Sequence, residues 1–168
     1  MPDEQNLDRS RYQVIPRVLV FVTRGEEILL LQIAPRKGKI TRWTGRYNGL
    51  GGHIERGEDP LTAARRELLE EAGVTADLRL RGILLVDTGE AVGIALHIFH
   101  GEYRSGELRA TPEGTPAWIP RHRLSEIPLV EDAPVLIETV LAMRSDSPPF
   151  CGRSFYEEDA LRVVINQA

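Results

Sequence analysis

The segment from residue 52 to 74, GHIERGEDPLTAARRELLEEAGV, constrains the fold of this chain more than any other stretch. Asp59 is a favoured N-cap, Pro60 suits the first position of a helix, and Gly73 suits the position just past its end. Between these signals, apolar residues recur at helical spacing, namely Leu61, Ala64, Leu68 and Ala72. The sequence therefore predicts a helix over residues 60–72 with one buried face.

The polar face of this helix concentrates acid in a single turn. Glu70 lies three residues after Glu67, and Glu71 lies four after it, so all three carboxylates share one face. Like charges at this spacing repel each other and weaken an isolated helix. A hard divalent cation with oxygen ligands is the simplest stabilising partner. Alternatively, the three glutamates form an acidic face that is exposed to solvent and binds no metal.

The remaining composition sets bounds on the kind of protein. A length of 168 residues fits a single domain over 13–168, preceded by a flexible arm over 1–12. No apolar run approaches the roughly 20 residues that span a bilayer, and the polar N-terminus shows no signal peptide. Cys151 is the only cysteine, which fits a reducing cytoplasm. The net charge of −4 predicts no stable nucleic-acid partner, and both a monomer and a homodimer remain open.

The order of predicted elements indicates the fold class. We expect strands over 14–23, 27–34, 78–87, 92–101 and 161–165, with shorter apolar runs at 117–119 and around Phe155. A basic loop spans 35–47, a second helix runs from an Asp132 N-cap to about Met143, and 145–152 is a linker. This order predicts an α/β fold, a mixed sheet with helices packed on its faces.

The stretch 52–74 resembles the Nudix box, G-x5-E-x7-R-E-U-x-E-E-x-G-U, where U is an aliphatic residue. Every defined position matches, at Gly52, Glu58, Arg66, Glu67, Leu68, Glu70, Glu71, Gly73 and Val74. The resemblance implies a Nudix-type α/β/α sandwich around a mixed β-sheet, with the box forming loop, helix and loop. It also implies hydrolysis of a nucleoside diphosphate linked to another group, with Mg²⁺ as cofactor and Mn²⁺ as a substitute.

The resemblance assigns roles to residues of the box. It implies that Glu67, Glu70 and Glu71 are catalytic and bind the metal, because metal ions neutralise the phosphate oxygens and activate water. The carbonyl of Gly51 and the carboxylate of Glu113 would be further metal ligands. The general base is open between Glu67, Glu71 and Glu113. Catalytic Arg66 would orient the loop and helix together with Glu58.

A second resemblance concerns one branch of the family, the oxidised-purine nucleoside triphosphatases. Their R-W-N-G-F-G-G segment resembles residues 46–52, and their W-P-D-D segment resembles residues 129–132. This implies that Asn48, Glu131 and Asp132 bind the edge of a purine. A turn at Asn48 and N-capping by Asp132 are the structural alternatives.

Two departures and one loop bear on the substrate. Tyr47 and Leu129 stand where that branch has tryptophan, so an aromatic wall is missing, and Trp43 is the candidate substitute. In the basic loop, Arg36 and Arg46 are candidates for binding the outer phosphates, because arginine offers forked donors. A solvated loop is the alternative.

We therefore expect a metal-dependent hydrolase that converts a nucleoside triphosphate to a nucleoside monophosphate and pyrophosphate. An oxidised purine nucleotide such as 8-oxo-dGTP is the leading substrate, which would make the protein a sanitiser of the nucleotide pool. The alternatives are a nucleotide sugar, a dinucleoside polyphosphate or capped RNA. A non-catalytic nucleotide sensor is a further alternative, although no box glutamate is lost.

Overall fold

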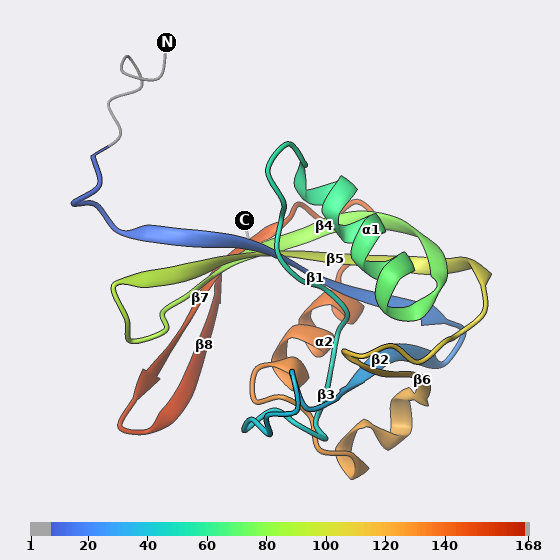
Figure 1. Cartoon of the computed structure of the whole chain (residues 1–168). Helices are drawn as coiled ribbons and strands as arrows, with labels where there is room; N and C mark the ends of the chain where they lie inside the picture. Colours follow the sequence, from blue (N-terminus) through green and yellow to red (C-terminus); the bar gives the residue numbers. More distant parts are fainter. Residues whose placement is uncertain (1–7, 167–168) are drawn as a thin grey trace.

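A mixed β-sheet with one helix against each face forms the centre of the computed structural model, which describes residues 8–166 (Figure 1). The strands are β1 (Gln13–Arg24), β2 (Glu27–Ile33), β3 (Tyr47–Asn48), β4 (Val74–Val86), β5 (Val92–Gly106), β6 (Gly114–Pro120), β7 (Phe150–Glu157) and β8 (Ala160–Asn166). The helices are α1 (Pro60–Ala72), the 3₁₀ helix η2 (Arg121–Glu126) and α2 (Ala133–Ala142). Of the arm expected over 1–12, residues 1–7 fall outside the described part, and residues 8–12 form a turn before β1.

The strand order is β3-β2-β1-β5-β4-β7-β8, and β6 pairs with the other edge of β2. The pairs β1·β5 and β4·β7 are parallel, and the other pairs are antiparallel. The predicted mixed sheet is therefore confirmed. No helix within residues 8–166 is long and apolar enough to cross a membrane.

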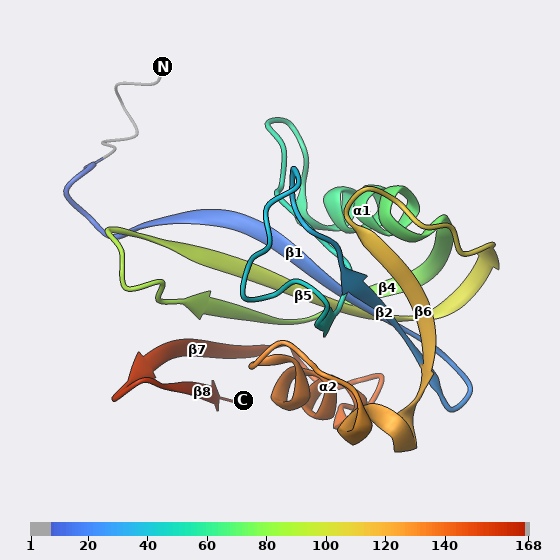
Figure 2. The ribbon, with the colours of Figure 1, turned by 60° about the horizontal axis from the view of Figure 1, so that its bottom comes forward.

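Alternation along β1 builds a core on each face of the sheet, because successive side chains of a strand point to opposite sides. Val18, Val20 and Val22 pack on one face with the apolar side of α1. Leu19 and Phe21 point the other way and pack with α2. Figure 2 shows the result, with α1 and α2 on opposite sides of the sheet. The sandwich arrangement predicted from the sequence is confirmed.

The glycine-rich segment 49–53 lies along the edge of β1. Leu50 exchanges hydrogen bonds with Val20, at N···O distances of 2.7 and 3.0 Å, and the Val18 amide donates to the Gly52 carbonyl at 2.9 Å. This segment passes directly into the loop before α1. The arrangement places the glycines beside the acidic face of the helix.

Some element boundaries differ from the prediction. β4 begins at Val74, directly after α1, rather than at residue 78, and β5 continues to Gly106. The linker expected over 145–152 is shorter, because β7 already begins at Phe150 and pairs there with β4. These extensions are held by strand pairing, such as Val74 with Gly106, between residues distant in the sequence.

Candidate active site

Helix α1 begins and ends at the predicted residues. The Asp59 side chain accepts hydrogen bonds from the backbone amides of Leu61 and Thr62, at 2.8 and 3.0 Å. Gly73 has a φ of 76° and donates to the Leu69 carbonyl at 3.0 Å, as expected for a left-handed C-terminal residue. Both caps are confirmed, and they fix which residues of α1 face the glycine-rich segment.

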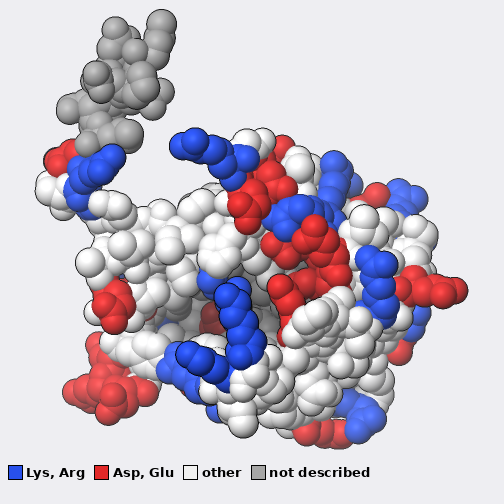
Figure 3. Space-filling view, viewed as in Figure 1, with Lys and Arg blue, Asp and Glu red and all other residues white. Residues whose placement is uncertain are grey.

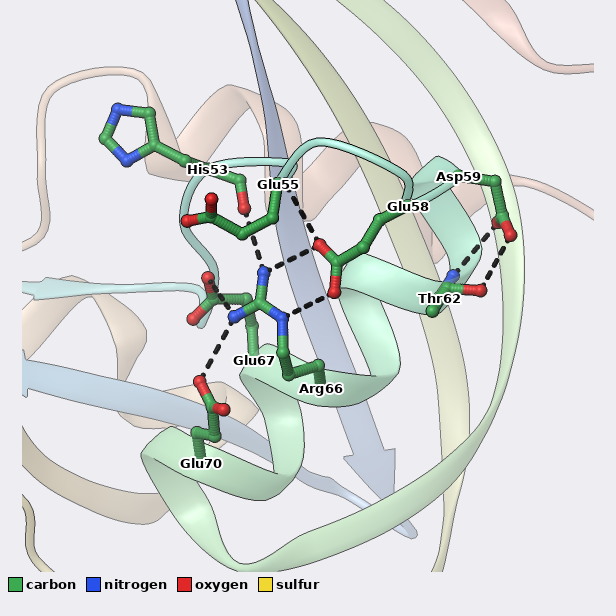
Figure 4. Close-up of polar contacts among 8 residues, drawn as sticks. All are labelled: His53, Glu55, Glu58, Asp59, Thr62, Arg66, Glu67 and Glu70. Carbon is green, nitrogen blue, oxygen red and sulfur yellow. Dashed lines mark hydrogen bonds and ion pairs between the residues drawn. The ribbon is translucent and has the colours of Figure 1, made fainter.

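Arg66 connects α1 to the loop that precedes it (Figure 4). Its Nε and Nη2 form a forked pair with Glu58, at 2.7 and 3.0 Å, and Nη2 also donates to the His53 carbonyl at 3.0 Å. Its Nη1 donates to Glu67 at 2.9 Å and to Glu70 at 3.1 Å. Interaction with Glu58 raises the pKa of Arg66. One guanidinium therefore holds the loop to the helix and also lies between two of the box glutamates.

Glu71 is buried and lies under the glycine-rich segment. Its Oε2 accepts a hydrogen bond from the Gly51 amide at 2.7 Å. Burial is the largest cause that raises the pKa of Glu71, to about 9, and the neighbouring Glu113 carboxyl adds to it. Burial also raises the pKa of Glu67, against the opposing effect of Arg66. The structure thus brings carboxylates from α1 and from the residue before β6 into one acidic cluster, Glu67, Glu70, Glu71 and Glu113.

This cluster offers the oxygen donors that Mg²⁺ and similar cations prefer. As the side chains stand within residues 8–166, no three acidic, histidine or cysteine groups form a ready-made metal cage. Two of these carboxylates, Glu67 and Glu70, form ion pairs with Arg66, at 2.9 and 3.1 Å. The Glu70 side chain is 60% exposed and free to turn away from Arg66. Burial and the neighbouring Glu113 disfavour the charged form of Glu71 and raise its pKa, and a cluster made of carboxylate oxygens is a donor set that fits a divalent metal.

Gly51 and Gly52 lie so close to β1 and to Glu67 that a side chain at either position would collide with them. Gly51 has a φ of 147°, and a Cβ there would lie 2.1 Å from the Val18 carbonyl oxygen. A Cβ on Gly52 would lie 2.4 Å from Oε1 of Glu67. Side chains at either position would push the segment away from β1 or from α1.

A hollow of about 580 Å³ opens over the acidic cluster. Its lining includes Arg36 and Lys37 of the basic loop, Glu55, and the four carboxylates of the cluster. Figure 3 shows acidic side chains gathered beside a hollow whose rim carries basic side chains. We call this hollow the acidic pocket.

A second hollow of about 330 Å³ lies on the α2 side of the sheet. Its lining includes Asn48, Glu131 and Asp132, the three residues predicted to read a base. Trp43, the candidate for the missing aromatic wall, also lines it. We call this hollow the inner pocket. The two pockets adjoin each other, because they share the lining residues Arg17, Ile33, Asn48, Gly49, Gly51 and Gly52.

Asn48 forms no Asn-Gly turn, and Asp132 occupies the N-cap position of α2 without capping it through its side chain. Asn48 lies in β3 and its Oδ1 accepts from the Gly49 amide at 2.8 Å, but Gly49 does not adopt the positive φ of an Asn-Gly turn. Asp132 precedes α2 but makes no capping hydrogen bond, because its own backbone is already helical, with φ −89° and ψ −17°. Burial raises the pKa of Asp132, with a further contribution from Glu131. Both side chains are thus left with capacity to bind a ligand.

The two arginines of the basic loop lie in different places. Arg36 lines the acidic pocket. Arg46 lines neither pocket, and its Nη1 donates to the Leu129 carbonyl at 3.3 Å. The structure therefore brings Arg36, but not Arg46, together with the other predicted site residues.

Sequence reasoning missed three residues that line the inner pocket, Arg17, Arg42 and Tyr156. Arg42 stacks on Trp43, with 4.0 Å from its Cζ to the ring centroid, and donates to the Tyr156 hydroxyl at 2.8 Å. That hydroxyl in turn donates to Glu131. Of the three, only Arg17 could have been noticed in the sequence. By the alternation of β1 it shares a face with Leu19 and Phe21, which pack in the core beside α2, so a charged residue is unexpected there.

Comparison with known proteins agrees with this geometry. The family model described as the NUDIX domain matches residues 14–140. The NAD-capped RNA hydrolase NudC of Pseudomonas syringae is 35% identical over 81% of this chain and 47% of its own length. The oxidized purine nucleoside triphosphate hydrolase of Danio rerio is 40% identical over 44% of this chain and 49% of its own length. The chain thus spans about half the length of these curated relatives.

Solved structures show the same fold. The MutT protein from Bacillus halodurans superposes with a TM-score of 0.67 and 25% identity, covering 89% of this chain and 97% of that one. The family model matches most of the chain, and it includes the glycine-rich segment, the caps and every box glutamate. The chain therefore belongs to the Nudix hydrolase family.

Proposed function

We propose that this chain is a metal-dependent Nudix pyrophosphohydrolase that cleaves a nucleoside triphosphate to a nucleoside monophosphate and pyrophosphate. The proposal rests on one observation, that the inner pocket and the acidic pocket lie next to each other and share lining residues. The inner pocket offers polar groups and an aromatic wall to a base, while the acidic pocket offers carboxylates for the metal. A nucleotide placed across the shared residues would bring its phosphates to the acidic cluster.

Nudix hydrolases generally use divalent metal ions. We propose Mg²⁺, with Mn²⁺ as a substitute, held by Glu67, Glu70, Glu71, Glu113 and the Gly51 carbonyl. When bound, the metal would neutralise phosphate oxygens and lower the pKa of the attacking water. Arg66 would release Glu70 to the metal and keep Glu58 and the loop in place, while Glu67, Glu71 or Glu113 would accept the proton of that water.

For the base, we propose a purine read by Asn48, Asp132 and Glu131 and stacked on Trp43. Their common placement in the inner pocket supports this reading. An oxidised purine such as 8-oxo-dGTP is the preferred substrate in the proposal, with clearance of damaged nucleotides in the cytoplasm as its role. Arg36, at the acidic pocket, is placed to meet the outer phosphates.

The second candidate is cleavage of capped RNA. It is favoured by one observation, since the relative named as an NAD-capped RNA hydrolase is similar over most of this chain. The oxidized purine nucleoside triphosphate hydrolases of Danio rerio and Mus musculus are similar over 44% and 52% of it. Both candidates share the same metal chemistry at the acidic cluster and differ in what occupies the inner pocket.

A substrate panel separates these candidates. The purified protein is incubated with Mg²⁺ or Mn²⁺ and with dGTP, 8-oxo-dGTP, ATP, ADP-ribose, a nucleotide sugar, a dinucleoside tetraphosphate or NAD-capped RNA, and the products are identified. The proposal predicts the highest kcat/KM for a purine triphosphate, with monophosphate and pyrophosphate as products. Turnover of NAD-capped RNA or ADP-ribose without turnover of any purine triphosphate would reject it.

A further inference from the structure

Arg17 is a half-buried arginine that forms no salt bridge within residues 8–166. Its side-chain hydrogen bonds go to His53, whose Nε2 accepts from Nε at 3.2 Å and from Nη2 at 3.0 Å. Because Nε2 accepts these two hydrogen bonds, it carries no proton. His53 therefore offers Arg17 an uncharged hydrogen-bond acceptor and no counter-charge. A charged group partly withdrawn from water normally has a counter-charge, and the described residues 8–166 place no carboxylate within salt-bridge distance of Arg17.

The charges around Arg17 sharpen this point. Burial lowers the pKa of Arg17, and the positive charge of Arg36 lowers it further. Arg36 and Arg17 both line the acidic pocket. Two guanidinium groups therefore line the same pocket as the glutamates, and among the described residues neither forms a salt bridge with them. An arrangement of this kind favours an anionic ligand between the two groups.

The position of Arg17 indicates which anion. Arg17 lines both the inner pocket and the acidic pocket, together with Asn48 and the glycines of the segment beside β1. A nucleotide with its base near Asp132 and its outer phosphates near the acidic cluster must cross this boundary. The group that lies there is the phosphate attached to the nucleoside. Arginine offers a planar fork of donors that suits a phosphate.

We propose that Arg17 binds the phosphate attached to the nucleoside and so positions the phosphate chain between the inner pocket and the acidic cluster. The inference rests on the proposed function, since it requires a nucleotide that spans both pockets. His53 would act as the positioning partner that holds the Arg17 guanidinium at the boundary. Arg36, which lies in the basic loop, would contact phosphates farther from the nucleoside.

The test compares four proteins, the wild type, Arg17→Gln, Arg17→Lys and His53→Ala, with Arg11→Gln as a control. Arg11 is an exposed arginine before β1 that lines neither pocket. The readouts are KM and kcat for the best triphosphate of the panel, the dissociation constant of α,β-methylene-dGTP, and the Mg²⁺ concentration that gives half-maximal rate. The unfolding temperature of each variant is measured in parallel.

We expect Arg17→Gln to raise KM and the dissociation constant of the analogue by about 10- to 100-fold, the effect of losing hydrogen bonds to a charged group. Arg17→Lys, which keeps the charge but not the fork, should recover part of this loss. His53→Ala should cost less than Arg17→Gln. The half-maximal Mg²⁺ concentration should change less than twofold. Arg17→Gln should unfold at the same or a higher temperature, because it removes a half-buried charge that has no salt-bridge partner.

Three results would overturn the inference while leaving the proposed function intact. The first is a KM and an analogue affinity within twofold of wild type in an Arg17→Gln protein whose parent hydrolyses triphosphates. The second is a shift in Mg²⁺ activation as large as the shift in KM, which would indicate a displaced glycine segment. The third is an equal loss in His53→Ala, which would assign Arg17 a purely structural role. A wild type without triphosphate turnover would instead reject the proposed function.

Discussion

The backbone amide of Gly51 donates a hydrogen bond of 2.7 Å to the carboxylate of Glu71, twenty residues later in the chain. This bond joins the segment along β1 to helix α1, and Gly51 lines the acidic pocket together with the four carboxylates of the cluster. It also holds a carboxylate that is buried and next to other acids. The site is therefore built by backbone geometry at the glycines and by charge on the helix.

The first prediction compares two glycines three residues apart. Gly52→Ala places a Cβ 2.4 Å from Oε1 of Glu67, the end of a side chain that can turn away. We expect at least about a tenfold loss of kcat/KM and a loss of stability below about 1 kcal/mol.

Gly49→Ala is the matched variant. Its Cβ would lie 2.8 Å from the Phe21 ring and 2.9 Å from both Leu19 and the Val20 carbonyl oxygen, all in a closely packed region. We expect a stability loss of about 1–3 kcal/mol, measured by urea unfolding. Equal stability losses in the two variants would contradict the distinction between a displaced ligand and an overpacked core.

The second prediction concerns pH and Glu71. Because burial and Glu113 raise its pKa to about 9, the folded metal-free protein keeps a proton that the unfolded chain releases near its ordinary pKa of 4.5. Stability from this group is then greatest at low pH and falls as the pH rises from about 5 to 9, by at most about 1.4 kcal/mol per pH unit. Glu71→Gln, which does not titrate, should show a flatter curve.

Metal should reverse this trend, because binding requires the deprotonated carboxylate. The increase in unfolding temperature caused by Mg²⁺ should grow with pH in the wild type and be small in Glu71→Gln. Thermal unfolding at pH 6, 7, 8 and 9, with chelator or with Mg²⁺, provides the measurement. Parallel curves for the two proteins in chelator would show that Glu71 is not the group responsible.

The third prediction contrasts two aspartates that precede helices. Asp59 caps α1 through two backbone amides, whereas Asp132 makes no capping bond at α2. Asp59→Ala should lower the unfolding temperature by several degrees. Asp132→Ala should change it by less than about 2 °C.

Asp132→Ala should instead reduce the preference for the best purine triphosphate over a pyrimidine triphosphate, by about tenfold. The ratio of kcat/KM values for the two nucleotides measures this preference. If Asp132→Ala lowered the unfolding temperature and left the ratio unchanged, Asp132 would be a capping residue and would not contribute to base recognition.

The fourth prediction concerns Arg66, whose guanidinium joins Glu58, the His53 carbonyl and the helix. Arg66→Ala should lower the free energy of unfolding by about 1–3 kcal/mol, because it removes several charge-assisted hydrogen bonds in a partly buried setting. Arg24→Ala, which breaks the exposed pair with Glu27, should cost less than about 1 kcal/mol. Urea unfolding of both variants tests this, and equal costs would mean that Arg66 is no more than a surface charge.

Local signals in the sequence predicted helix α1 well. Asp59, Pro60 and Gly73 act through backbone geometry within a few residues, so their meaning does not depend on the rest of the fold. The box glutamates were equally readable because helical spacing alone places them on one face. The glycine-rich segment was recognised in the sequence. Its position along β1 was not predictable, because it depends on hydrogen bonds to Val18 and Val20, which are distant in the sequence.

Other features depend on long-range pairing and escaped prediction. Alternation along β4 suggests that Arg79 and Arg81 are both surface charges, yet Arg81 is only 8% exposed and its Nη1 donates to the Arg144 carbonyl. The register of β4 against β5 shifts between Leu80 and Gly82. Arg79 also donates to the Ser145 carbonyl, so both arginines reach the segment after α2 through contacts between residues distant in the sequence. The contributions of Arg42 and Tyr156 to the inner pocket escaped prediction for a similar reason, since these residues come from segments distant in the sequence from each other and from Asp132.

The central claim is that the carboxylates of α1 hold a metal that cleaves a nucleotide, and Glu70 tests it most directly because its side chain is exposed and free to change without disturbing the core. The measurement is the Mg²⁺-dependent release of pyrophosphate from the best triphosphate by wild type, by Glu70→Gln and by Glu90→Gln, an exposed acid on the β4–β5 turn. We predict metal-dependent turnover in wild type and Glu90→Gln, and a loss of about 100-fold or more in Glu70→Gln, with an unchanged unfolding temperature. Wild-type protein without turnover in Mg²⁺ or Mn²⁺, or a Glu70→Gln protein as active as Glu90→Gln, would contradict the account.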